Sequence, residues 1–148
     1  MITESEHLMN MLKTESNKAI DIAKKFSQIR YIDGKDIKKP LIPKVWGIYL
    51  WKLKDAVEVV YVGVALGRKG LWGRIASQHL RSSYTKSVFR KKIAKEYNLG
   101  LREGSANYIL ENCSLAYLPC PNEKRVTLKI SELLLIAVYK PKYNSDST

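Results

Sequence analysis

Two clusters of glycine and tyrosine flank a segment that is typical of a β-hairpin. They are the triplets Gly-Ile-Tyr at 47–49 and Tyr-Val-Gly at 61–63. If the turn centres on Asp55, Tyr49 faces Tyr61 and Gly47 faces Gly63, and directly opposed residues have Cβ atoms about 5 Å apart. Two phenols would then stand beside two positions that have no side chain. Such a surface can admit a phosphate backbone next to hydroxyl groups that handle protons.

The two triplets resemble the motifs of the GIY-YIG nucleases, with Val62 in place of the second isoleucine. Three further positions follow in the order of this family. They are Arg74 on a predicted helix, Glu132 at the start of an apolar run, and Asn144 at the end of Pro-Lys-Tyr-Asn. The resemblance covers residues 45–144. It implies an α+β fold whose core is a three-stranded antiparallel sheet flanked by helices.

The resemblance also implies a metal-dependent DNA endonuclease that hydrolyses phosphodiester bonds, which requires a positioned water, proton removal and charge stabilisation on the phosphate. Glu132 would hold Mg²⁺ or Mn²⁺, since Mg²⁺ keeps most of its waters and takes few protein carboxylates. Arg74 would contact two phosphate oxygens. Tyr49 and Tyr61 would position the water and accept its proton, if Arg74 and the cation lower the phenol pKa from ~10. Which tyrosine is the base stays open, and Glu132 could instead be a surface residue.

Two further candidate catalytic residues, His79 and Asn144, have less certain roles. Many relatives place His or Tyr four residues after the arginine, where this chain has Gln78. His79 is one residue further, which in a regular α-helix points it roughly 140° away from Arg74. Either the helix is irregular, or Gln78 occupies the site, or His79 faces elsewhere. Asn144 either holds the site together by hydrogen bonds or ends the last helix.

The formal net charge of +12 predicts a polyanionic partner. Between residues 65 and 99 the chain has nine Lys or Arg residues and one acid, Glu96. The alternative is a solvated lysine-rich surface, but the position next to the hairpin favours contact with DNA. The residues expected to bind nucleic acid are Arg68, Lys69, Arg81, Lys86, Arg90, Lys91 and Lys95.

The order of predicted elements is ββααβα, preceded by one N-terminal helix. The elements are a helix over 4–30, a connector over 35–44, strands over 45–54 and 57–64, helices over 71–80 and 86–97, a strand over 108–118 and a helix over 122–139. We expect residues 1–43 to form the N-terminal helix and a basic connector, and residues 44–148 to form the nuclease domain. Apolar residues of the first helix follow a 4-3 rhythm, broken by Glu15. This rhythm predicts a helix that packs on its own domain or makes a homodimer.

Other sequence features narrow the class of protein. Cys113 and Cys120 lack the spacing of a metal site, so we expect reduced thiols in a cytoplasmic protein. No signal peptide or membrane span is expected. Because the chain ends four residues after Asn144, we expect no C-terminal DNA-binding domain, which favours a stand-alone restriction-type or phage or mobile-element nuclease. The alternatives are a non-catalytic nucleic-acid-binding module with the same fold and a basic RNA-binding protein, which would leave Glu132 unexplained.

Overall fold

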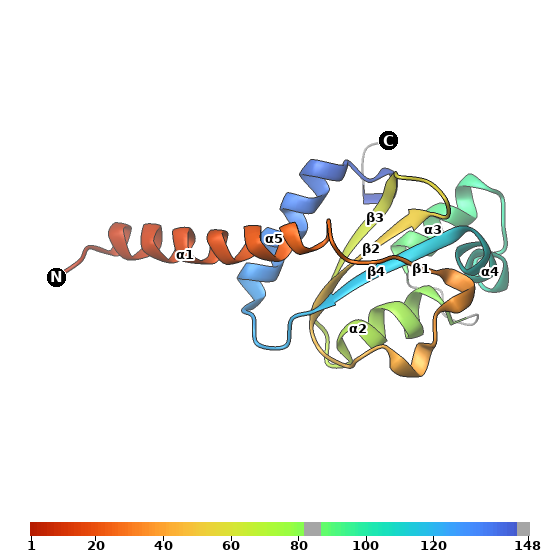
Figure 1. Cartoon of the computed structure of the whole chain (residues 1–148), viewed down its shortest axis with the longest axis horizontal. Helices are drawn as coiled ribbons and strands as arrows, with labels where there is room; N and C mark the ends of the chain where they lie inside the picture. Colours follow the sequence, from red (N-terminus) through yellow and green to blue (C-terminus); the bar gives the residue numbers. More distant parts are fainter. Residues whose placement is uncertain (82–86, 145–148) are drawn as a thin grey trace.

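A four-stranded antiparallel sheet organises the structure, a computed structural model that describes residues 1–81 and 87–144 (Figure 1). Its strands are β1 (Ile32–Asp33), β2 (Gly47–Leu53), β3 (Val59–Ala65) and β4 (Cys113–Pro119), in the order β1-β4-β2-β3. The α+β class is confirmed, whereas the expected number of three strands is wrong. The additional strand, β1, is a two-residue segment in which Ile32 pairs with Leu115 and Asp33 with Ser114.

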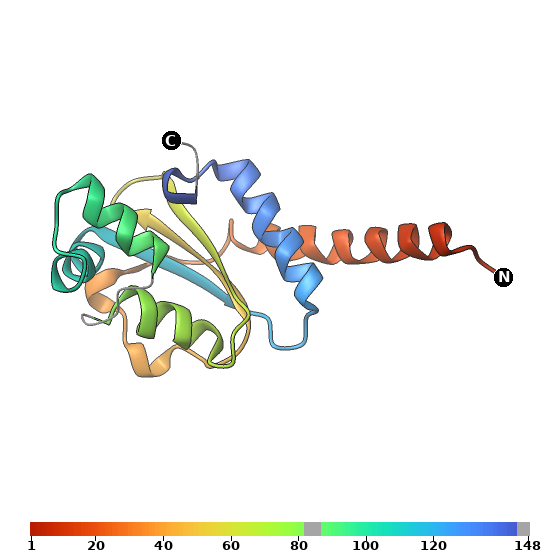
Figure 2. The same cartoon turned by 180° about the vertical axis from the view of Figure 1, so that it is seen from behind.

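Helices cover both faces of this sheet (Figures 1 and 2). They are α1 (Glu4–Lys25), α2 (Gly70–Trp72), the π-helix η3 (Gly73–His79), α3 (Val88–Glu96), α4 (Glu103–Asn112) and α5 (Arg125–Tyr139). Three short 3₁₀ turns, η1 (Gly34–Asp36), η2 (Lys39–Leu41) and η4 (Lys142–Asn144), complete the described elements. Within the described ranges, no helix is both long and apolar enough to cross a membrane.

The sheet divides the core into two layers, because successive side chains of a strand point to opposite faces. Ile48 and Leu50 of β2 contribute to the layer beneath α1 and α5. Tyr49 and Trp51 contribute to the layer beneath η3, α3 and α4, together with Tyr61 of β3. The two tyrosines therefore share one face of the sheet, which is the face that the π-helix covers.

The predicted strand over 108–118 is wrong in its first half, where the structure has the end of an additional helix, α4. Burial of Ser105, Ala106 and Ile109 follows helical spacing, and the strand begins only at Cys113. The apolar pair Ile109 and Leu110 resembles the start of a strand when it is read alone. After the hairpin come the continuous segment α2–η3, then α3, α4, β4 and α5. The expected order ββααβα therefore lacks one helix, α4.

The expected facing of Tyr49 and Tyr61 across the hairpin is also wrong. The observed pairs are Gly47 with Ala65, Tyr49 with Gly63, and Trp51 with Tyr61. Because this register differs by two residues rather than one, both phenols still lie on the same face. Tyr49 and Tyr61 are diagonal neighbours, with ring centroids 6.2 Å apart.

The glycines of the two triplets make room for protein atoms and not for a phosphate backbone, contrary to expectation. A Cβ atom at Gly63 would lie 2.2 Å from Cζ of Tyr49, so the phenol of Tyr49 needs a glycine opposite it. A Cβ atom at Gly47 would lie 2.4 Å from the carbonyl oxygen of Leu118 on β4. The second triplet therefore helps to fix the position of the first triplet's tyrosine.

Candidate active site

Tyr49 is held at the centre of a buried chain of polar groups. Its hydroxyl lies 2.7 Å from Nε2 of His79, and Nδ1 of His79 lies 2.6 Å from Oγ of Ser87. Burial, with the charges of Arg74 and Arg90 nearby, holds the pKa of His79 well below its usual value. The imidazole is therefore neutral at neutral pH, with one ring nitrogen as donor and the other as acceptor.

A π-helix explains how His79 reaches this position although it lies five residues after Arg74. Over Gly73–His79 the backbone follows i→i+5 hydrogen bonding, and the Leu80 amide donates to the carbonyl of Ile75 at the end of this segment. Such segments occur frequently at functional sites. Of the three alternatives, the irregular helix is the one observed. Gln78 has a different role, since its Oε1 accepts a hydrogen bond of 3.0 Å from Nη1 of Arg74.

Arg74 carries a buried donor, Nε, that makes no hydrogen bond among the residues that the structure describes. The guanidinium as a whole interacts with the hydroxyl of Tyr49. A buried donor of this kind costs free energy unless a ligand or water satisfies it. A hollow of about 340 Å³ adjoins Arg74 and is lined by residues from Gly67 to Gln78.

Glu132 joins the site from the other side of the edge strand β3. It lies on α5, is partly buried, and its Oε1 is 3.8 Å from Nζ of Lys129. Electrostatic interactions link it to Arg74 and to both tyrosines. Burial raises the pKa of Glu132, and the charges of Lys129 and Arg74 oppose this increase. We call Tyr49, Tyr61, Arg74, His79 and Glu132 the site cluster.

The site cluster contains one acidic residue, which limits how it could hold a metal ion. The described residues contain no group of three or more His, Cys, Asp or Glu side chains placed to bind a metal. Mg²⁺ does not need such a group, because it is often held by one or two carboxylates together with waters and substrate phosphates. A partly buried carboxylate with a raised pKa gains from a nearby cation. Glu132 therefore fits the Mg²⁺ or Mn²⁺ that we expect.

The two tyrosines differ in exposure. Tyr49 is 0% exposed and Tyr61 is 8% exposed, so Tyr61 lies nearer to solvent. Burial raises the pKa of both phenols, and Arg74 lowers each of them by less than burial raises it. Arg74 therefore lowers the pKa of both phenols, as expected, but burial outweighs it without a bound cation, and both hydroxyls are protonated at neutral pH.

Asn144 acts on the backbone of β3. Its Nδ2 donates to the carbonyl of Val62, and its Oδ1 accepts from the amide of Val62, both at 2.7 Å. Val62 lies between Tyr61 and Gly63, so this pair of bonds fixes the strand that carries Tyr61. Of the two roles considered for Asn144, the one that holds the site together by hydrogen bonds is observed.

Ser87 is a site residue that the sequence did not reveal. Its Oγ contacts His79 and accepts a hydrogen bond of 3.2 Å from the Arg90 amide at the start of α3. A serine before a predicted helix is a signal for an N-cap. That signal indicates where a helix begins, but it does not show that the same hydroxyl also contacts a histidine of the site.

The basic residues expected to bind nucleic acid divide into three groups. The exposed ones are Arg68, Lys69, Arg81, Lys91 and Lys95. Lys86 lies outside the described residues. Arg90 is 0% exposed, so its expected role in DNA contact is wrong. Its guanidinium donates to Ser105 Oγ and to four backbone carbonyl oxygens, those of Gln78, Arg81, Leu101 and Arg102.

Arg90 and its neighbour Lys91 should therefore have separate effects. Arg90→Met should lower the free energy of unfolding by about 2 kcal/mol or more, because several buried carbonyl groups lose their donor. Lys91→Met should change stability by less than about 0.5 kcal/mol. It should weaken DNA binding and reduce the slope of log affinity against log salt by about 0.9 for a lost phosphate contact. Urea denaturation and salt titrations of DNA binding measure these effects, and a salt slope unchanged in Lys91→Met would place the contact elsewhere.

No protein-family model and no curated protein matches this chain. Among solved structures, the chain is similar to the GIY-YIG N-terminal endonuclease domain of UvrC from Thermotoga maritima, a point mutant bound to the catalytic divalent cation. The two sequences are 22% identical, the match covers 72% of this chain and 90% of that domain, and the TM-score is 0.44.

Proposed function

We propose that this chain is a GIY-YIG endonuclease that hydrolyses phosphodiester bonds of DNA with the help of a divalent cation. The observation that carries this proposal is the buried, unpartnered Nε of Arg74 beside two phenols and a carboxylate. A module that only binds nucleic acid has no need for a partly buried arginine that interacts electrostatically with two tyrosines and a glutamate. A phosphate in the adjoining hollow would lie against the Arg74 side chain.

Each residue of the site cluster has a separate task in this proposal. Arg74 binds the scissile phosphate and stabilises the negative charge that develops on its oxygens. Glu132 would hold Mg²⁺ or Mn²⁺, which when bound supplies Lewis-acid activation of the phosphate and of water. Tyr61, the phenol nearer to solvent, positions the attacking water. His79 holds the hydroxyl of Tyr49 in place, and Asn144 holds the strand that carries Tyr61.

Exposed cations around the site cluster would bind the flanking phosphates. Arg68 and Lys69 lie on the loop that lines the hollow beside Arg74. Lys91 and Lys95 lie on the neighbouring helix α3. Contacts of this kind carry no base information, so these residues would add affinity on every sequence alike.

The biological setting is also part of the proposal. We infer a stand-alone restriction-type, phage or mobile-element nuclease, because the site cluster and the basic residues all lie within one small domain. A cytoplasmic location is consistent with Cys113 and Cys120, which are both buried and free. The proposed reaction does not depend on this biological setting or on this location.

Incubation of supercoiled plasmid with the purified chain tests the proposed reaction. Mg²⁺ or Mn²⁺ should permit conversion to nicked or linear DNA, and excess chelator should prevent it. Arg74→Met, purified in parallel, should cut at least ~10²-fold more slowly, because removing one preorganised donor costs about that much. DNA binding without any cutting in either metal would favour the non-catalytic module instead.

A further inference from the structure

The N-terminal helix α1 is packed on the domain over only its C-terminal half. Ala19 and Ile22 are buried beside α5. Near the point where α5 begins, buried Glu15 accepts a hydrogen bond of 2.7 Å from Oγ1 of Thr127. Every residue before Glu15 is exposed, and this free half of α1 projects from the domain in Figures 1 and 2. The free half of α1 is short enough that, as an isolated helix, it would be only marginally stable in water.

The free half of α1, residues 4–14, has an apolar side. Leu8, Met9 and Leu12 are 58%, 61% and 50% exposed. Leu8 and Leu12 lie in the same row of the helix as Ala19, because positions seven and eleven residues apart share a face. The row that packs on α5 therefore continues beyond the start of α5, where no described residue covers it.

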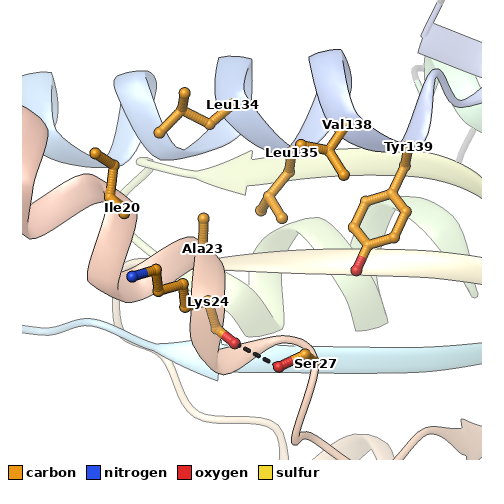
Figure 3. Close-up of a pocket in the computed structure, with 8 residues that line it drawn as sticks. All are labelled: Ile20, Ala23, Lys24, Ser27, Leu134, Leu135, Val138 and Tyr139. Atoms are coloured by element: carbon orange, nitrogen blue, oxygen red, sulfur yellow. Dashed lines mark hydrogen bonds between the residues drawn. The ribbon is translucent and has the colours of Figure 1, made fainter.

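An apolar groove lies between the packed half of α1 and α5 (Figure 3). Its volume is about 360 Å³, and its walls include Ile20 and Ala23 from α1 with Leu134 and Val138 from α5. Ile20 and Val138 are exposed although their side chains are apolar. The chain therefore has an open apolar groove and, on the same helix, an uncovered apolar ridge.

Charge along α1 indicates what would fill this groove. The first turn of α1 contains Glu4 and Glu6, and the last turn contains Lys24 and Lys25. A second α1 in antiparallel orientation would place its acidic first turn against the basic last turn. In the register that is symmetric about Thr14, the acidic first turn lies level with the basic last turn of the second helix, and Leu8 lies level with Ile20.

We propose that two copies of this chain form a two-fold symmetric dimer through this groove. Each copy inserts the free half of its α1 between α1 and α5 of its partner. Because each copy supplies both the ridge and the groove, the interface closes on itself and adds no third copy. Leu134 turns roughly 200° away from Glu132 along α5, so the dimer leaves the site cluster open.

Light scattering on the full chain at tens of micromolar tests the dimer. The chain should have about twice the monomer mass of 17.0 kDa. The double variant Leu8→Glu, Leu12→Glu should give the monomer mass and still unfold cooperatively, because both residues are exposed in the single chain, and its melting temperature should no longer depend on protein concentration. Asn10→Glu adds one negative charge in the same region of α1, on the opposite side, and should remain a dimer. A wild-type chain that is monomeric at high micromolar concentration, with and without DNA, would overturn the proposal.

A charge exchange tests the antiparallel register. The double variants Glu4→Lys, Glu6→Lys and Lys24→Glu, Lys25→Glu should each weaken self-association tenfold or more, because both ends of the interface then bear like charges. Mixing the two variants should restore a heterodimer, in which every end again meets the opposite charge. If the leucine variants are monomeric but this mixture stays unpaired, the antiparallel register is wrong.

Discussion

Replacement of Glu132 with glutamine should lower the rate of DNA cutting by about 10³-fold and leave DNA affinity equal or higher. Glutamine keeps the size of the side chain but removes the charge that would hold the cation. A bound cation contributes several kcal/mol to such a transition state, and each 1.36 kcal/mol is a factor of ten in rate. Single-turnover cutting and binding measured without metal separate the two effects. The exposed Glu111 on α4 provides the control, since Glu111→Gln should cut at the wild-type rate.

The same carboxylate should set the acidic limit of activity. Burial raises the pKa of Glu132, so its charged form is lost at a higher pH than for a free glutamate. Below saturating cation, where protons compete with the metal for this carboxylate, the cutting rate should therefore begin to fall at a higher pH than it would for a free glutamate. Lys129 opposes the increase, so Lys129→Met should move the acidic limit to still higher pH. Wild-type activity of Glu132→Gln, or full cutting in excess chelator, would rule out a metal role for Glu132.

The residues of the site cluster could be predicted because their chemistry limits the residue types. Tyr49, Tyr61, Arg74 and Glu132 are far apart in the sequence, yet electrostatic interactions link them in the structure. Their order and spacing resemble those of a known family, and that resemblance was enough to select them. The position of His79 could not be settled in the same way. The direction of a side chain is predicted from its position in the sequence by assuming 3.6 residues per turn. A π-helix has more residues per turn, so the prediction fails there.

The hairpin register was wrong because the position of the turn was assumed to fix it. Side-chain volume decides it instead, since the phenol of Tyr49 occupies the space that a Cβ atom at Gly63 would need. A β-bulge between Trp51 and Lys52 then absorbs the difference between the two strands. Both facts are tertiary, and neither follows from composition or periodicity.

Counting charges could not show which basic residue is buried. Arg90 lies between exposed Val88 and Lys91 in the sequence, but on α3 it shares the buried side with Ala94. Its guanidinium is satisfied by carbonyl groups from segments far along the chain, such as Leu101. The sequence does place Arg90 four residues before the apolar Ala94, and such spacing indicates a shared helix face. Counting cations does not use this spacing.

Tyr61→Phe should lower the cutting rate by roughly 10²-fold, because a reactant misplaced by about 1 Å can cost that much and this hydroxyl positions the attacking water. Tyr49→Phe should lower it at least tenfold. Tyr49→Phe should also lower the free energy of unfolding by about 1–3 kcal/mol, because the Tyr49 hydroxyl contacts the buried Nε2 of His79. Tyr61 is slightly more exposed than Tyr49, and no hydrogen bond to His79 is lost, so Tyr61→Phe should lower stability by less than Tyr49→Phe. The two variants should therefore separate the phenol that positions water from the phenol that is held by the histidine.

The double variant distinguishes a shared water site from two independent contributions. If both hydroxyls act on one water, the loss of the first already disables the site, and the combined effect should be much smaller than the product of the single effects. Tyr117→Phe on β4 removes a hydroxyl outside the site cluster and should cut at the wild-type rate. The rates should be measured from neutral to alkaline pH, because burial keeps both phenols protonated over most of this range. Wild-type rates for both single variants at every pH would show that the hydroxyls are not catalytic and would favour a chain that binds DNA without cutting it.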